Sequence, residues 1–169
     1  MKLISLLEKL EYTCLQGSTD QEVKNVIYDS RKVEEGSLFI CIRGAVVDGH
    51  KFVPDVVAKG AKVLIVEEAV EAPEDVTVIL VKDTRYAMAF ISAAYFGYPA
   101  EKLKTIGITG TKGKTTTTYM VKSILENAGY KVGLIGTIEA IIGDKVIPAK
   151  NTTPESYVIQ EYFHEMAEA

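Results

Sequence analysis

Apolar and polar positions alternate in blocks of helical and strand periodicity over the first part of the chain. Apolar residues recur every three or four positions in residues 3–10, 52–59 and 84–96, which predicts three helices. Shorter runs between them are β-branched or alternate in polarity, which is typical of strands. These runs cover residues 23–28, 38–42, 62–66 and 76–81. Such a mixture of helices and strands predicts an α/β fold.

A linker-like segment follows this first block. Residues 98–102 read Tyr-Pro-Ala-Glu-Lys, and we predict a domain boundary near residues 98–103. The predicted domains are residues 1–100 and residues 101–169. In the second domain we expect, in order, a buried strand at 104–109, a helix at 115–128, a strand at 131–137, a hairpin about Gly143-Asp144, and a helix with Thr153 as N-cap and Pro154 at its first position.

The turn after the expected strand at 104–109 is rich in glycine, lysine and threonine. A glycine-rich turn between a strand and a helix aims backbone N–H groups and the positive helix end at one point, where a polyphosphate can bind. Lys114 would reach the terminal phosphates as the catalytic residue, and the Thr115 hydroxyl would bind Mg²⁺. We therefore interpret this turn as a P-loop for ATP. Its predicted ATP-binding residues are Gly110, Thr111, Lys112, Gly113, Lys114, Thr115 and Thr116.

The loop departs from the general P-loop pattern at one position. Ile108 stands where that pattern has its first glycine, and Gly107 lies one residue too far upstream. The remainder, Gly110-x-x-Gly113-Lys-Thr115, is intact. The alternative interpretation is a glycine-rich turn that carries an exposed lysine and binds nothing. The departure at Ile108 indicates a particular variant of the loop.

The strands expected at 104–109 and 131–137, with the helix between them, predict a βαβ unit with parallel pairing. A P-loop domain needs about five parallel strands to bury both sheet faces. Residues 103–169 provide only two of them and a hairpin. We therefore expect the second, parallel-sheet ATP-binding domain to be cut short. The alternative is a complete small protein with an exposed sheet edge.

Composition and charge limit the classes of partner. The 169 residues are 47% hydrophobic and 25% charged, with a net charge of −4, which is typical of a soluble globular protein. Because no basic stripe appears, we expect no nucleic-acid partner. The amino terminus is too short and too charged for a signal peptide, and no apolar run approaches the ~20 residues that span a bilayer. We expect a cytoplasmic protein without a membrane partner.

The cysteines and histidines suggest no metal centre. Cys14 and Cys41 lack CxxC spacing and form no zinc set with His50 and His164, so we expect two free, buried thiols. We expect His50 to end its loop in a structural role, and we assign no role to His164.

Three separated motifs resemble the Mur ligase family, whose enzymes build the peptide stem of bacterial peptidoglycan. Thr109-Gly-Thr-Lys-Gly-Lys-Thr-Thr116, preceded by Ile108, is similar to their ATP loop, which commonly lacks the first general glycine. Asn151-Thr-Thr-Pro154 is similar to the substrate motif of the MurE type. A third set of residues is similar to the uridine-nucleotide domain of the MurE and MurF types. It consists of Asp29-Ser-Arg31, Gly36-Ser-Leu-Phe39, Gly44 and Asp48-Gly-His50. The resemblance covers essentially the whole chain.

The resemblance implies a monomeric, ATP-dependent ligase that adds meso-diaminopimelate or L-lysine to UDP-N-acetylmuramoyl-L-alanyl-D-glutamate. ATP phosphorylates the substrate carboxylate, and the incoming amine displaces phosphate from the acyl phosphate. The small first domain would bind the UDP part of this substrate. Other parts of the family's active site, among them a modified lysine, would lie beyond residue 169. We therefore expect these residues alone not to catalyse the full reaction.

The same resemblance implies which residues contact the UDP-muramoyl-peptide. Without it, Asp29-Ser-Arg31 is an ordinary turn at a strand end in which Arg31 has a structural role, and residues 151–153 only cap a helix. Glu155 is a candidate Mg²⁺ ligand beside Thr115, although a first-turn glutamate favoured by the helix dipole is the commoner explanation. The implied substrate contacts are Tyr28, Ser30, Ala45, Val46, Val47, Asn151, Thr152 and Thr153.

Three other functions stay open. The first is a MurF-type ligase acting on the UDP-muramoyl tripeptide, against which the Asn-Thr-Thr-Pro segment argues. The second is a non-catalytic module that senses a UDP-sugar. The third is a P-loop kinase, which is disfavoured because no recognisable acceptor site or lid follows the loop.

Overall fold

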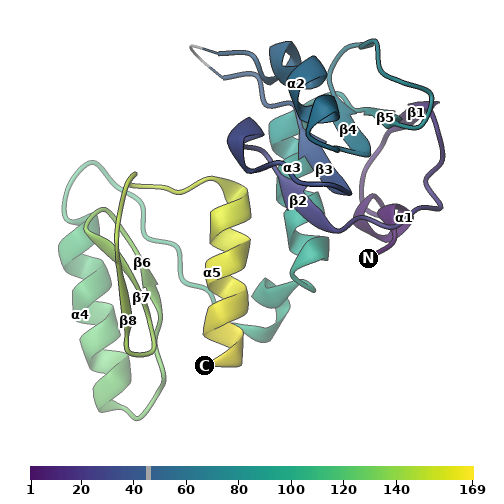
Figure 1. The fold of residues 1–169 in the computed structure, drawn as a ribbon. Helices are drawn as coiled ribbons and strands as arrows, with labels where there is room; N and C mark the ends of the chain where they lie inside the picture. Colours follow the sequence, from purple (N-terminus) through teal and green to yellow (C-terminus); the bar gives the residue numbers. More distant parts are fainter. Residues whose placement is uncertain (45–46) are drawn as a thin grey trace. The chain divides into compact units, whose positions relative to one another are not determined.

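The computed structural model describes residues 1–44 and 47–169, which form two compact units (Figure 1). The first unit is Met1–Tyr95 and the second is Phe96–Ala169. A five-stranded sheet lies in the first unit and a three-stranded sheet in the second, and both units contain helices. This architecture confirms the predicted α/β class.

The sheet of the first unit is parallel except at one edge. Its order is β1-β5-β4-β3-β2, in which the last four strands run parallel and confirm the predicted ones. The antiparallel edge strand β1 is absent from the sequence prediction, because its four residues show no apolar alternation and are mostly exposed. The strands are β1 Thr13–Gln16, β2 Asn25–Ile27, β3 Ser37–Ile40, β4 Val63–Val66 and β5 Thr77–Leu80.

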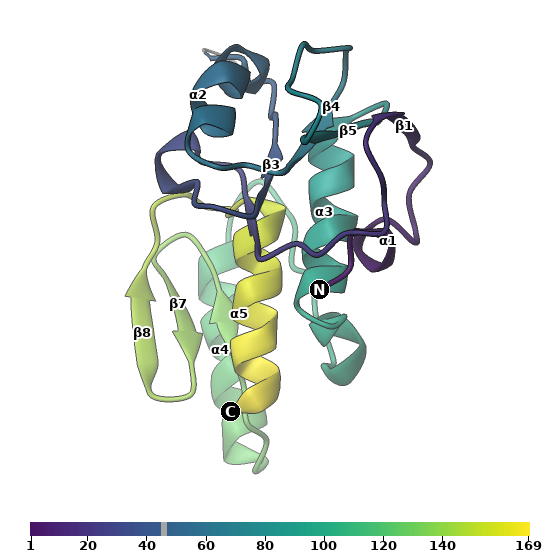
Figure 2. The same ribbon diagram turned by 45° about the vertical axis from the view of Figure 1, so that its right-hand side comes forward.

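Helices cover both faces of this sheet, as Figures 1 and 2 show. On one face lies α2 (Val53–Ala58), and on the other lie α1 (Leu3–Leu6) and α3 (Thr84–Tyr95), which contact each other. Every residue of β3 and β4 is therefore buried, as expected for parallel strands with two covered faces. Helix α1 is shorter than the helix predicted at 3–10, because the chain turns at the exposed pair Glu8-Lys9.

Local capping explains where the longer helices of this unit begin. The Asp83 side chain accepts a hydrogen bond from the Tyr86 N–H at 2.9 Å, so Asp83 caps the N-terminus of α3. Pro54 lies in the first turn of α2. A proline is tolerated there because its missing N–H has no intrahelical partner to lose.

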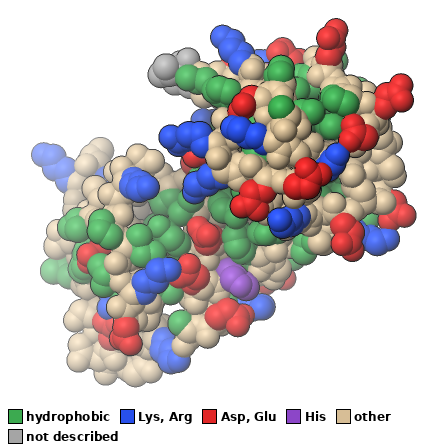
Figure 3. All heavy atoms as spheres, viewed as in Figure 1, with side chains coloured by type: hydrophobic (Ala, Val, Ile, Leu, Met, Phe, Trp, Pro, Cys, Tyr) green, Lys and Arg blue, Asp and Glu red, His purple; other side chains and the backbone are tan. Residues whose placement is uncertain are grey.

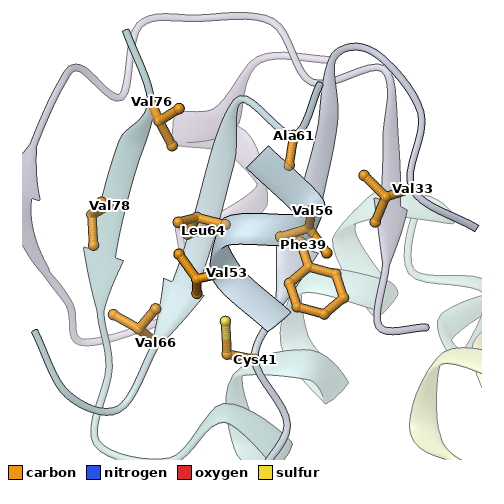
Figure 4. Close-up of a cluster of buried hydrophobic side chains, with 10 residues drawn as sticks. All are labelled: Val33, Phe39, Cys41, Val53, Val56, Ala61, Leu64, Val66, Val76 and Val78. Carbon is orange, nitrogen blue, oxygen red and sulfur yellow. The ribbon is translucent and has the colours of Figure 1, made fainter. Parts of the chain in front are cut away.

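Ten buried side chains pack between α2 and the sheet (Figure 4). Phe39 and Leu64 are register partners on neighbouring strands, and they pack in one cluster with Val53 and Val56 of α2. The other members are Val33, Cys41, Ala61, Val66, Val76 and Val78. This cluster is the main apolar core beneath α2.

The two cysteines lie in different environments. Cys41 belongs to the core, and burial raises the pKa of its thiol to about 12, so it stays protonated at neutral pH. Cys14 is exposed, and the expectation that both thiols are buried was wrong. The reason is its place on the edge strand β1, which the sequence pattern did not reveal.

The sheet of the second unit is antiparallel, in the order β6-β7-β8. Strands β7 and β8 form the predicted hairpin, and Gly143 at its turn has a φ of +56°, a conformation that favours glycine. The elements are η3 Pro99–Lys102, α4 Lys114–Asn127, β6 Leu134–Ile135, β7 Glu139–Ile142, β8 Lys145–Pro148 and α5 Ser156–Glu168.

The predicted βαβ unit does not form among the described residues. Residues 104–109 are largely exposed and belong to no strand, and Ile106 is 65% exposed. The strand predicted at 131–137 shortens to β6, which pairs antiparallel with β7. Because an isolated extended segment leaves its backbone groups unpaired, residues 104–109 cannot become a strand without a neighbour.

The start of α5 also differs from the prediction. The N-cap is Glu155, whose ψ of 152° is extended, and the first helical residue is Ser156. Thr153 is therefore not the N-cap, and Pro154 is not the first helical residue. The immediate reason is the extended backbone of Glu155, which stops the helix from beginning at Pro154.

The surface of the second unit carries much apolar area. Neither α4 nor α5 has a buried residue, so this unit lacks a core like that of Figure 4. Figure 3 shows acidic and basic side chains interspersed on one face of the molecule. None of the helices in the described part of the chain is both long and apolar enough to cross a membrane. The large exposed apolar residues of the second unit are Ile106, Met120, Ile124, Tyr130, Ile138 and Val146.

Candidate functional site

The glycine-rich turn leads directly into α4 in the second unit. Gly113 is the N-cap of α4 and has a φ of +78°, and Gly110 has a φ of +153°. Both values lie in the region that side chains with a Cβ rarely adopt. The first turn of α4 carries no acidic residue, so the positive helix end is not neutralised there. The turn geometry expected of a phosphate-binding loop is present.

A shallow hollow of about 380 Å³ lies over this turn. Two lysines and no carboxylate line it, so its wall suits an anion. Five of the lining residues are threonines, whose hydroxyls can donate to phosphate or bind a cation. The lining residues are Thr111, Lys112, Gly113, Lys114, Thr115, Thr116, Thr137 and Thr152.

The Lys114 side chain folds back onto the turn. Its ammonium donates a hydrogen bond to the Gly110 carbonyl oxygen at 2.7 Å. The charge is therefore held at the rim of the hollow, next to the helix N-terminus. A bound phosphate would offer this ammonium a stronger, charge-assisted partner than a neutral carbonyl.

Two segments far from the turn in sequence also reach the hollow. Thr152, from the Asn-Thr-Thr-Pro segment, is one of its lining residues, whereas its neighbours Asn151 and Thr153 are exposed outside the lining. Thr137 is a lining residue that the sequence interpretation missed. The available signal was its place at the end of the predicted strand 131–137, where ligands of α/β sheets commonly bind.

Contacts within the β6–β7 bend hold Thr137. The Gly136 N–H donates to the Glu139 carbonyl oxygen at 3.0 Å, across the bend. The Glu139 carboxylate accepts a hydrogen bond from the Tyr119 hydroxyl of α4 at 2.6 Å. The bend is thereby tied to the helix that begins at the glycine-rich turn.

Only one of the two candidate magnesium ligands lines the hollow. Thr115 lines the hollow, but Glu155 is not a lining residue and forms the N-cap of α5 without a side-chain cap hydrogen bond. The donors that fit Mg²⁺ at the hollow are therefore hydroxyls, with phosphate oxygens completing the usual oxygen set. Glu155 stays a prediction without support from this arrangement.

In the first unit, the predicted UDP contacts Tyr28 and Ser30 lie half-buried just after β2. Ser30 begins the short helix η1 (Ser30–Lys32), and its carbonyl oxygen accepts a hydrogen bond from the Lys59 ammonium at 3.0 Å. The Arg31 guanidinium donates twice to the Asp29 carboxylate, at 2.8 and 2.7 Å. This pairing lowers the pKa of Asp29 to about 2, and it gives Arg31 the structural role expected from the sequence.

Val47, the third predicted contact that the structure describes in this unit, is 49% exposed. Its carbonyl oxygen accepts a hydrogen bond from the Gly44 N–H at 2.9 Å. The predicted contacts Ala45 and Val46 lie outside the described residues. Because Tyr28, Ser30 and Val47 follow the neighbouring parallel strands β2 and β3, they belong to the same edge of the sheet.

A polar network lies behind Val47. The Asp48, His50 and Glu68 side chains offer ligand atoms within 4.8 Å of one another. Both ring nitrogens of His50 are nevertheless occupied, Nδ1 by Asp48 at 2.6 Å and Nε2 by the Glu67 N–H at 3.0 Å. Because no lone pair of the ring is free, this cluster is not a metal site, and His50 has the expected structural contacts.

Two family models match the chain. The model described as the Mur ligase family, catalytic domain, matches residues 22–96, and that of the Mur ligase middle domain matches residues 108–169. The second match includes every residue that lines the hollow.

Curated relatives match the whole chain. The UDP-N-acetylmuramoyl-L-alanyl-D-glutamate–2,6-diaminopimelate ligase of Clostridium perfringens is 53% identical over 169 residues, which are 100% of this chain and 35% of the relative. The ligase of the same name from Cytophaga hutchinsonii is 41% identical over 171 residues, again 35% of the relative. The chain thus spans about a third of the length of these relatives.

Solved structures share the fold. A structure of a UDP-N-acetylmuramoyl-L-alanyl-D-glutamate–2,6-diaminopimelate ligase matches 99% of this chain and 34% of its own, with a TM-score of 0.75 and 22% identity. A crystal structure of MurF from Acinetobacter baumannii matches 97% of this chain and 32% of its own, with a TM-score of 0.64 and 28% identity.

Proposed function

The chain belongs to the Mur ligase family, and on that premise we propose that it serves an ATP-dependent ligase that joins 2,6-diaminopimelate to UDP-N-acetylmuramoyl-L-alanyl-D-glutamate. This reaction makes a precursor of peptidoglycan. Its support is the name shared by relatives that are 41% to 53% identical to the chain. The proposal narrows the predicted amino-acid substrate from lysine or diaminopimelate to diaminopimelate.

One observation carries the proposal. The hollow over the glycine-rich turn is lined both by the predicted ATP loop and by Thr152 of the predicted substrate motif. A reaction that transfers a phosphoryl group from ATP to a carboxylate needs both reactants at one place, because positioning supplies much of the rate. The presence of Thr152 in this lining supports a site where ATP and the acid substrate bind next to each other.

The roles of the residues follow from the chemistry of a carboxylate. A carboxylate is a poor acyl donor because its leaving group would be oxide. Transfer of a phosphoryl group from ATP converts the carboxylate into an acyl phosphate, whose leaving group is phosphate. In the proposed site, the N–H groups of residues 110–116 bind the phosphates. Lys114 neutralises the charge that develops on them, and the Thr115 hydroxyl contributes to Mg²⁺ binding. Thr152, with Asn151 and Thr153 beside it, contacts the acid substrate.

The first unit would hold the uridine end of that substrate. Tyr28, Ser30 and Val47 belong to the carboxyl-terminal edge of its parallel strands, which is the usual ligand edge of such sheets. Ser30 offers a hydroxyl and an N–H, and the exposed Val47 offers apolar surface and main-chain groups. We propose that the protein acts as a monomer in the cytoplasm, where its nucleotide substrates are made.

The proposal is tested by binding and by activity. Calorimetric titrations of the chain with Mg²⁺–ADP and with the UDP-muramoyl dipeptide should each show one site, and Lys114→Ala should weaken only the first. A ligase assay on the complete gene product should prefer diaminopimelate over lysine, and the dipeptide over the tripeptide. Preference for the tripeptide would favour the MurF type. Binding without any ligase activity would favour the sensing module.

A further inference from the structure

A network centred on His50 joins the segments that follow three parallel strands of the first unit. Arg43, Asp48 and His50 follow β3, Glu67 follows β4, and Thr84 follows β5. Arg43 donates to Asp48 at 3.1 Å. The Glu67 carboxylate accepts hydrogen bonds from the N–H and the hydroxyl of Thr84, both at 2.8 Å. The network therefore spans the carboxyl-terminal edge of the sheet.

The hydrogen bonds of His50 fix its tautomer. Because the Glu67 N–H donates to Nε2 at 3.0 Å, that nitrogen is an acceptor, and the proton of the neutral ring resides on Nδ1. Nδ1–H then donates to the Asp48 carboxylate at 2.6 Å. The side chain of His50 is only 5% exposed. One buried ring thus bridges the loop after β3 to the end of β4.

This bridge lies next to Val47 in the chain. Gly49 N–H donates to the Ile42 carbonyl oxygen at 2.9 Å, and a Cβ on Gly49 would lie 2.7 Å from the Ile42 nitrogen. The segment is therefore pressed against the end of the strand, at a distance that only glycine permits. Val47 is consequently fixed on both sides. Its carbonyl oxygen accepts the hydrogen bond from the Gly44 N–H, and the residue after it, Asp48, is bound to His50.

We propose that His50 is a positioning residue for nucleotide binding, which sets the affinity for uridine diphosphate by fixing Val47 at the edge of the sheet. This inference rests on the proposed function, in which that edge binds the uridine end of the substrate. His50 itself is buried and does not contact the ligand. It acts through the Asp48 carboxylate, which also accepts a hydrogen bond from the His50 N–H at 3.0 Å.

Three substitutions at His50 separate its two hydrogen bonds. His50→Leu removes both and keeps the apolar volume. His50→Asn places an amide near the position of Nδ1 and can still donate to Asp48, whereas His50→Gln reaches the Glu67 N–H and loses the bond to Asp48. Leu6→Ala is the matched control, because Leu6 is 1% exposed, lies in α1 and takes no part in the network. Ser30→Ala tests the proposed uridine site directly.

The experiment measures the dissociation constant for UDP by calorimetry and the urea midpoint for each variant of the chain. We expect His50→Leu to weaken UDP binding at least tenfold, His50→Asn to retain more affinity than His50→Gln, and Leu6→Ala to lower the midpoint with unchanged affinity. Where His50→Leu does not fold, the Asn and Gln pair decides. Nitrogen-15 NMR of the wild type should show a protonated Nδ1 and an unprotonated Nε2 that accepts a hydrogen bond.

Two results would overturn the inference while leaving the proposed function intact. One is wild-type affinity for UDP in His50→Leu, or in both amide variants. The other is a loss of affinity in Leu6→Ala that equals the loss in the His50 variants at equal urea midpoint. If the wild-type chain itself does not bind UDP, the uridine site of the proposed function fails first, and the inference falls with it.

Discussion

The Lys114 ammonium and the Gly110 carbonyl oxygen are 2.7 Å apart, so the lysine at the end of the glycine-rich turn donates a hydrogen bond to the residue at its start. A neutral carbonyl is a weaker partner for an ammonium than a phosphate oxygen. The contact therefore holds the Lys114 ammonium at the rim of the hollow, where we propose that a phosphate oxygen replaces the carbonyl as its partner.

Replacing Lys114 should abolish most of the activity. We expect Lys114→Met in the complete gene product to lower kcat by about 10²–10³-fold, on the order of 3 kcal/mol, as for other preorganised groups that stabilise developing charge. Steady-state kinetics with ATP measure the effect. The matched control is Lys122→Met on the same helix, whose ammonium pairs with Glu126. Equal losses in the two variants would remove the special role of Lys114.

Gly113→Ala should destabilise the second unit and weaken nucleotide binding. A Cβ at residue 113 would meet no atom within 4 Å, so the loss of folding free energy comes from the φ of +78° alone. We expect about 1 kcal/mol of strain, visible as a lower urea midpoint for this unit. The methyl group also obstructs the approach of phosphate oxygens to the backbone. Gly97→Ala, at a φ of +72° with the same open surroundings, is the control. It should show the strain without weaker binding of Mg²⁺–ADP.

Acid should remove part of the stability of the first unit through Asp29. Its pKa falls from the ordinary 3.8 to about 2 because Arg31 donates to the carboxylate. A folded-state pKa below the unfolded one stabilises the protein above pH 3.8, and the contribution is lost as the pH falls through about 2.

We expect this contribution to be about 1 kcal/mol, because Arg31 is 85% exposed and solvent screens the pair. Urea unfolding of the wild type and of Asp29→Asn should differ by this amount at pH 7 and converge near pH 2. Arg31→Met should behave like Asp29→Asn. A constant difference between the wild type and Asp29→Asn across the whole range would show that the carboxylate is not coupled to folding.

Truncating the core beneath α2 should be costly. Leu64 is fully buried in β4 and packs in the cluster of Figure 4. We expect Leu64→Ala to lower the free energy of unfolding by about 3 kcal/mol, from lost burial and the cavity left behind. Tyr86→Ala is a surface control, since Tyr86 is 60% exposed. Chemical denaturation followed by far-ultraviolet circular dichroism measures both.

Periodicity predicted the first unit well because its strands are buried on both faces. Runs such as residues 62–66 are continuous and β-branched, and α3 has an apolar face and an aspartate cap. The edge strand β1 escaped prediction because an edge strand needs few apolar residues. The local sequence was therefore sufficient to predict those helices and strands whose residues are buried.

The second unit was harder to predict because its strands depend on which segments pair with one another. Residues 104–109 have a strand-like sequence, but strand formation requires a neighbour that no local rule identifies. The glycine-rich turn could be predicted from its own residues alone, and it leads into a helix at Gly113 as expected. Thr137 reaches the hollow through the β6–β7 bend, which depends on contacts between elements rather than on a motif.

Residues 104–109, which belong to no strand, would affect the affinity of the proposed nucleotide site. The turn is fastened on one side by α4, while the residues leading into it carry no ladder of hydrogen bonds. In the proposed function, part of the gross free energy of nucleotide binding would order the backbone of residues 104–109. Amide protons of residues 104–109 should accordingly exchange rapidly with solvent in the free chain and slow down when Mg²⁺–ADP is bound.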